Sequence, residues 1–141
     1  MEVPWDREQQ RDSWLEQSGM ALRAAEEILL GGLCEDAIAN SFLAMLYAAR
    51  TVLTGGGMEI EGWEEVVERF QEAARSIGLS AENRRSLAIV RDLYHRVAVT
   101  GEMEADPLTA SACLDDARSF VAEVSEVLKA AGGGADREET V

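Results

Sequence analysis

The stretch from residue 37 to residue 54 reads AIANSFLAMLYAARTVLT, an unbroken run of helix formers that stops at three consecutive glycines. Small residues, chiefly alanine, recur on several of its faces, and its two aromatic side chains are Phe42 and Tyr47. Because small side chains let a helix approach its neighbours closely, this composition predicts burial on more than one side. The helix should pack inside its own bundle and also close to a partner chain.

Glycine and proline divide the rest of the sequence into further helical segments. We expect helices over residues 13–30, 35–54, 63–76 and 81–99, and a fifth that opens at Asp106-Pro107 and ends before Gly132. Ser13 with Glu16 fits a capping box, and Ser80 is a favourable N-cap. Short connections favour antiparallel neighbours, so the predicted fold class is all-α, an up-down antiparallel four- to five-helix bundle.

The domain organisation follows from these breaks. We predict an N-terminal extension over residues 1–12, a helical bundle over residues 13–131, and a disordered acidic tail over residues 132–141. The length of 141 residues and the 47% of hydrophobic residues suit one domain with its own core.

Composition also narrows the classes of function. The net charge of −14 opposes DNA binding, whose affinity comes mainly from neutralised phosphates. The N-terminus has no basic start followed by an apolar run, and we find no window of about 18 apolar residues. We therefore expect a cytoplasmic protein with no membrane segment. Cys34 and Cys113 lack metal-ligand spacing, so we expect both to be small core or near-surface residues.

The predicted fourth helix differs from the rest of the chain in charge. Residues 81–99 hold four arginines and two acids, a net charge of +2, together with the single histidine. Arg91 and His95 are four residues apart and so share one helix face. That face is offset from the apolar stripe of Leu87, Val90 and Tyr94, which places the pair at a groove or an interface edge rather than in the core.

An arginine beside a histidine suits phosphoryl chemistry on RNA. Histidine moves protons near neutral pH, and a guanidinium holds a phosphate with two hydrogen bonds. RNA supplies its own nucleophile, the 2′-hydroxyl, so the candidate catalytic residues are Arg91 and His95. The residues expected to guide RNA are Arg84, Arg85 and Arg96. The alternative interpretation is a solvated helix face whose cations pair with nearby carboxylates.

Other cofactor chemistry finds no support in the sequence. The carboxylate clusters around Glu64 and Asp115 lack the Glu-x-x-His motif of di-metal bundles, and the glycine runs lack the lysine of a phosphate-binding loop. We expect no metal and no cofactor.

Several of these segments resemble HEPN domains, the small helical bundles of prokaryotic toxin–antitoxin and defence systems. The resemblance rests on the amphipathic helix of residues 14–30, the glycine turn at Gly31-Gly32, the helix of residues 37–53, the stretch 90–99 and the closing helix of residues 110–128. It covers roughly residues 13–130. It implies a homodimer whose facing fourth helices form a shared cleft, in which active members cut RNA without metal.

The resemblance leaves three functions open. Active members separate their arginine and histidine by four to six residues, whereas three residues separate Arg91 from His95; Phe42 also stands where the family usually has tyrosine. The leading hypothesis is therefore a HEPN-like dimeric interaction module, one component of a toxin–antitoxin or nucleotidyltransferase-associated system, with a minimal nucleotidyltransferase as partner. The alternative is a metal-independent ribonuclease toxin that binds RNA and uses Arg91 and His95. The third is a structural helical bundle with no catalytic role.

Overall fold

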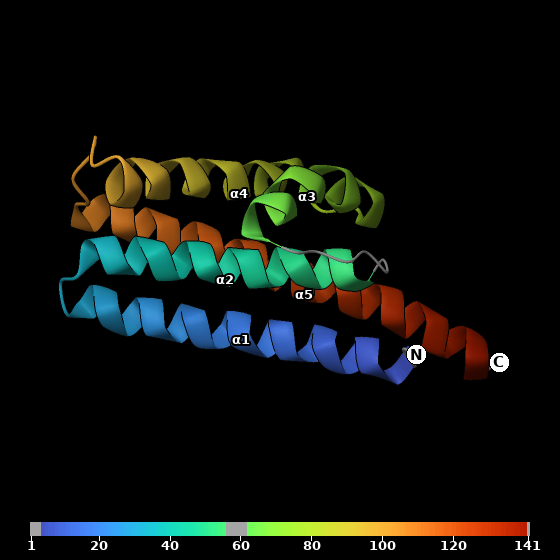
Figure 1. Ribbon diagram of the computed structural model, residues 1–141. Helices are drawn as coiled ribbons and strands as arrows, with labels where there is room; N and C mark the ends of the chain where they lie inside the picture. Colours follow the sequence, from blue (N-terminus) through green and yellow to red (C-terminus); the bar gives the residue numbers. More distant parts are fainter. Residues whose placement is uncertain (1–3, 56–61, 141) are drawn as a thin grey trace.

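The computed structural model describes residues 4–55 and 62–140, and the side chains of residues 13–54 and 62–130. Within these ranges the chain forms helices and no strand. The elements are α1 (Pro4–Leu30), α2 (Cys34–Gly55), α3 (Trp63–Ile77), α4 (Ala81–Tyr94), the π-helical turn η1 (His95–Val99) and α5 (Pro107–Thr140). The predicted all-α bundle is confirmed. Figure 1 shows α1 and α2 as antiparallel neighbours, with α3 and α4 on the other side of α2 from α1.

Helix α2 is the centre of the bundle and packs against α1, α3, α4 and α5. On one face of α2, Ile38, Met45 and Ala49 are fully buried, and alanines on its other faces are buried as well. The small side chains allow α1 to come close enough for the Ser18 hydroxyl to donate a hydrogen bond of 2.8 Å to the Ala44 carbonyl oxygen. The prediction that α2 is buried on several sides within the bundle is therefore correct.

Two glycine turns reverse the chain at the ends of α1 and α3. Gly32 and Gly78 have φ angles of 82° and 83°, in the left-handed region that favours glycine. The amide after each glycine donates to a carbonyl five residues back, Leu33 to Ile28 and Leu79 to Ala74, as in a Schellman motif. These turns make α2 antiparallel to α1 and lead the chain directly from α3 into α4.

The start of α4 is fastened to α5. The Ser80 hydroxyl accepts a hydrogen bond from the Asn83 amide, which confirms the predicted N-cap. The Glu123 carboxylate on α5 accepts hydrogen bonds from the Ser80 amide, the Ser80 hydroxyl and the Asn83 side chain, at 3.0, 2.7 and 2.7 Å. Burial raises the pKa of Glu123, but these hydrogen bonds outweigh it, so the pKa lies below its ordinary value. This network fixes the direction in which α4 runs along the bundle.

The outer ends of α1 and α5 differ from the prediction. α1 begins at Pro4 rather than Ser13, because residues 5–12 include Glu, Gln and Arg, which favour helix, and because proline suits the first helical position. α5 continues to Thr140, so the predicted helix end before Gly132 is wrong. Three glycines weaken a helix by about 1 kcal/mol each relative to alanine but do not by themselves break it.

The expectation that no window is apolar enough to span a membrane is also wrong. The segment Cys34–Thr54, which lies within α2, is long enough and apolar enough to cross a membrane, with a mean hydropathy of 1.2. In this structure 61% of that window is buried inside the bundle. The central position of α2 accounts for its hydropathy, because a helix surrounded by other helices is apolar on most faces.

Candidate functional site

A groove of about 510 Å³ opens between α2 and α4, beside the first turn of α3. We call it the α2–α4 groove. Its apolar lining is formed by Ala39, Phe42, Leu43, Leu46, Val67 and Tyr94, and Trp63 and Val99 extend it outward. Its polar lining residues are Glu64, Arg91 and His95. The groove is therefore an apolar surface with a carboxylate and two basic side chains.

Arg91 and His95 both line this groove with exposed side chains. Arg91 lies in the last turn of α4, and His95 begins the π-helical turn that follows. The His95 amide donates to the carbonyls of Arg91 and Asp92, so the backbone holds the two side chains one turn apart. Among the described residues, no side chain forms a hydrogen bond or an ion pair with either of them. The pair is thus available to a ligand or to a second protein chain.

Aromatic contacts fix the wall of the groove beside His95. The rings of Phe42 on α2 and Tyr94 on α4 lie 5.4 Å apart with a tilt of 31°. Such a contact contributes about 0.5–1.5 kcal/mol beyond the burial of area. Because Tyr94 directly precedes His95, this contact positions the histidine backbone relative to α2.

A second aromatic cluster closes the groove at the start of α3. Trp63 lies edge-on to Tyr47 at 5.5 Å, and Tyr47 stacks on Trp14 at 5.6 Å. The Arg50 guanidinium lies over both indoles, at 4.5 Å from the Trp14 centroid and 5.4 Å from the Trp63 centroid. Cation–π and edge-to-face contacts of this kind hold α3 against α1 and α2. Trp14 and Trp63 therefore act as packing anchors.

The three arginines expected to guide RNA occupy different positions. Arg84 lies seven residues before Arg91 and thus on the same face of α4, where it is half-buried. Arg85 is exposed on the adjacent face. Arg96 pairs with Asp92 at 3.2 Å, which partly neutralises it. None of the three lines the α2–α4 groove. Their positive charges therefore lie outside it, along α4 and η1.

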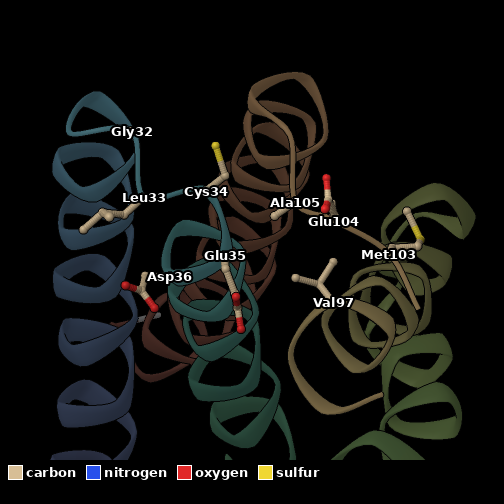
Figure 2. Close-up of a pocket in the computed structure, with 9 residues that line it drawn as sticks. All are labelled: Gly32, Leu33, Cys34, Glu35, Asp36, Val97, Met103, Glu104 and Ala105. Atoms are coloured by element: carbon tan, nitrogen blue, oxygen red, sulfur yellow. The ribbon is translucent and has the colours of Figure 1, made fainter. Parts of the chain in front are cut away.

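A second cavity of about 430 Å³ lies at one end of the bundle. Figure 2 shows it between the α1–α2 turn and the loop that follows η1, with Val97 facing the start of α2. We call it the bundle-end cavity. The π-helical turn contributes to both sites, because His95 and Val99 line the groove whereas Val97 lines the bundle-end cavity.

The sequence identifies Arg91 and His95 as candidate site residues but does not reveal the surface around them. Periodicity does not predict that the rings of Phe42 and Tyr94, on different helices, are in contact. Nor does it predict the π-helical turn, in which the Thr100 amide donates to the His95 carbonyl at 2.9 Å. The clustered β-branched residues Val97, Val99 and Thr100 disfavour a regular helix only weakly and do not identify this geometry. In the described part of the chain, no three His, Cys, Asp or Glu side chains lie together as a metal site would require.

The sequence was compared with curated proteins and with models of protein families. No curated protein matches the chain. The sequence model of the HEPN domain, in contrast, matches residues 12–127, which span α2, α3 and α4 and nearly all of the described core. The resemblance to HEPN domains is thereby confirmed, and this chain belongs to the HEPN domain family.

Proposed function

We propose that this protein is a dimeric interaction module of a two-component system, either toxin–antitoxin or nucleotidyltransferase-associated, and that two copies pair through the α4 side of the bundle. The observation that carries the proposal is the open α2–α4 groove. Its walls are apolar and aromatic and include the exposed Val99, and its basic side chains have no partner among the described residues. Ile89 is a further exposed apolar residue, on another face of α4. Surfaces of this composition favour association.

Charge constrains how the two copies meet. Two α4 faces that each carry Arg84, Arg85 and Arg91 would repel each other in direct contact. The neighbouring α3 carries exposed carboxylates four residues apart at Glu64, Glu68 and Glu72. A two-fold arrangement that sets α4 of one copy against α3 of the other pairs these opposite charges and places the two Arg91–His95 pairs along one seam.

Light scattering coupled to size-exclusion chromatography tests the pairing. Wild-type protein at micromolar concentration should elute with twice the mass of the 141-residue chain. Ile89→Ser should shift it toward the monomer, whereas Leu108→Ser, an equally drastic change at an exposed position of α5, should not. A monomeric wild type would contradict the proposal and would favour a purely structural bundle.

The second candidate function is a metal-independent ribonuclease. It is supported by the exposed Arg91 and His95 on the wall of one groove. In this reaction the 2′-oxygen of RNA attacks the adjacent phosphorus and the bond to the 5′-oxygen breaks, giving a cyclic phosphate and a free 5′-hydroxyl. A histidine takes the 2′-hydroxyl proton or returns one to the leaving oxygen, and an arginine stabilises the charge on the phosphate.

Two substitutions separate this activity from binding alone. His95→Ala should abolish cleavage and any growth inhibition on expression, and Arg91→Ala should reduce both by about 100-fold or more, the loss typical of a transition-state donor. Both variants should keep the dimer mass. Equal cleavage by wild type and His95→Ala would reveal a contaminating nuclease, and the interaction module would then stand alone.

A further inference from the structure

The end of the bundle opposite the two ends of the described chain is the second unusual surface of this molecule. The α1–α2 turn, the loop after η1 and the start of α5 all lie there (Figure 1). The bundle-end cavity opens between them and is lined by apolar side chains that include Leu33, Val97, Met103 and Ala105. Its volume of about 430 Å³ falls within the usual range of binding pockets.

Three leucines at this end of the bundle are exposed. Leu30, Leu33 and Leu108 are 83%, 57% and 84% accessible, which makes them three of the seven exposed large hydrophobic residues among the described side chains. A single exposed leucine is ordinary, but three beside an apolar cavity favour an interaction surface. Both ends of the described chain lie at the opposite end of the bundle (Figure 1), so no described segment of this protein covers these leucines.

Charge indicates what kind of molecule fits this surface. The segments 27–36 and 97–109, which form it, contain six acidic residues and no Lys, Arg or His. Elsewhere, exposed acids such as Glu26 and Asp92 pair with arginines at 3.1 and 3.2 Å, but no ion pair among the described residues involves any of these six. An uncompensated negative rim attracts a positively charged partner.

Helix capping and the helix dipole account for only some of these carboxylates. Glu35 and Asp36 lie in the first turn of α2, where negative charge is favourable. Asp106 accepts a hydrogen bond of 2.7 Å from the Thr109 amide, which caps α5 and lowers the Asp106 pKa. Glu102 and Glu104 lie in the loop between η1 and α5 and have no such role. Figure 2 shows Glu104 projecting beside the cavity, on the same side as Cys34.

We propose that this bundle end is a docking surface for a segment of another protein that carries basic residues and at least one aliphatic side chain. The aliphatic side chain enters the bundle-end cavity and packs beside the exposed leucines. The basic residues lie against Glu102 and Glu104. This surface is separate from the α2–α4 groove and does not depend on pairing through α4.

The rate at which Cys34 is alkylated reports directly whether a peptide occupies the bundle-end cavity. It lines the bundle-end cavity and is half-buried, whereas Cys113 is buried, with desolvation raising its pKa to about 11. Iodoacetamide at about pH 8 should therefore modify Cys34 well before Cys113, because the thiolate is the reactive form. The probe is a synthetic 12-residue peptide of alternating Arg and Leu, with an Arg/Ser and a Glu/Leu peptide as controls.

The Arg/Leu peptide should slow alkylation of Cys34 by at least about fivefold, and the two control peptides by less than about twofold. The variant Glu102→Gln/Glu104→Gln should weaken this protection by at least about fivefold. The control variant Glu16→Gln/Glu126→Gln, which removes the same charge at exposed positions of α1 and α5 outside both surfaces, should weaken it by less than about twofold.

Two results would overturn the proposal. Equal weakening by both double variants would show that only the overall field of the protein attracts the peptide. Equal protection by the Arg/Ser and Arg/Leu peptides would show that the leucines and the cavity take no part. The dimer mass, measured in parallel, separates this test from the proposed function, because Ile89→Ser should leave Cys34 protection unchanged and Glu102→Gln/Glu104→Gln should leave the dimer intact.

Discussion

The α2–α4 groove and the bundle-end cavity are of similar size but differ in charge. The groove carries Arg91 and His95 beside a single carboxylate, Glu64, whereas the cavity has an acidic rim with no basic residue in the segments that form it. One π-helical turn separates them and contributes side chains to both. A small acidic bundle can therefore carry two surfaces of different charge, because the end of a bundle and the face of a helix are formed by different residues.

Deleting Ala98 should have the largest effect, because it removes the extra residue that makes η1 a π-helical turn. The hydrogen bond from Thr100 to the His95 carbonyl would become an ordinary α-helical one, and Val97 and Val99 would become consecutive residues about 100° apart. They could then no longer point into the cavity and the groove at the same time. Dimer affinity and Cys34 protection should both fall by at least about tenfold, and the free energy of unfolding by about 1–3 kcal/mol.

The control for this deletion is Ala98→Ser, which keeps the chain length at an exposed position and should change none of these quantities. If the deletion affected only one of the two surfaces, the π-helical turn would not be the element that they share.

Salt should weaken binding at the two surfaces to different extents, with a smaller effect than the Ala98 deletion. Raising NaCl from about 0.05 to 0.5 M shortens the range of exposed charges from about 14 Å to about 4 Å. The protection of Cys34 by the Arg/Leu peptide should weaken by about tenfold, because it depends on the acidic rim. Dimerisation should weaken by less than about threefold, since apolar contact supplies most of it; analytical ultracentrifugation over the same salt series measures this. A stronger salt effect on the dimer than on the peptide would reverse the comparison.

Replacing Phe42 by leucine should affect the groove alone. The substitution removes the ring contact with Tyr94 at 5.4 Å and should lower the free energy of unfolding by about 1 kcal/mol. Urea denaturation measures the loss, and Phe42→Tyr, which keeps the ring, should show little of it. Cys34 protection should not change in either variant, and a change there would mean that the two surfaces are coupled through α2.

Acidification should slightly lower the stability of the helices that carry each surface, and a different carboxyl group is responsible in each case. Glu123 anchors the start of α4 and Asp106 caps α5, and hydrogen bonds hold both pKa values below their ordinary 4.5 and 3.8. A carboxyl group with a lowered pKa stabilises the fold above its ordinary value and loses this contribution as the pH falls through the folded value. Glu123→Gln and Asp106→Asn should each flatten the decline of stability between about pH 6 and pH 3, as urea unfolding would show.

Asp116 should affect the pH dependence of stability in the opposite direction. Burial, Asp115 and Glu82 raise its pKa, so protonation relieves a penalty and Asp116→Asn should be more stable than wild type near neutral pH.

A steeper pH dependence of stability in Glu123→Gln than in wild type would show that the hydrogen bonds of Glu123 do not favour its charged form.

The sequence alone determined the helices and most of their limits. Gly32 and Gly78 end α1 and α3 because they adopt φ angles that other residues avoid, and Ser80 and Asp106 begin α4 and α5 because their side chains accept amide hydrogen bonds. These are local effects between residues within a few positions of one another. The spacing of Arg91 and His95 on one face is local too, and it was predicted for the same reason.

Only the tertiary structure decided what surrounds those residues. The contact of Phe42 with Tyr94, the place of Arg50 between Trp14 and Trp63, and the opening of two cavities depend on how helices distant in sequence pack. The π-helical turn belongs to the same class, because the Thr100 to His95 bond forms where α4 ends beside α2 and no residue pattern specifies it. Local chemistry sets where helices begin and end, whereas packing sets which side chains share a site.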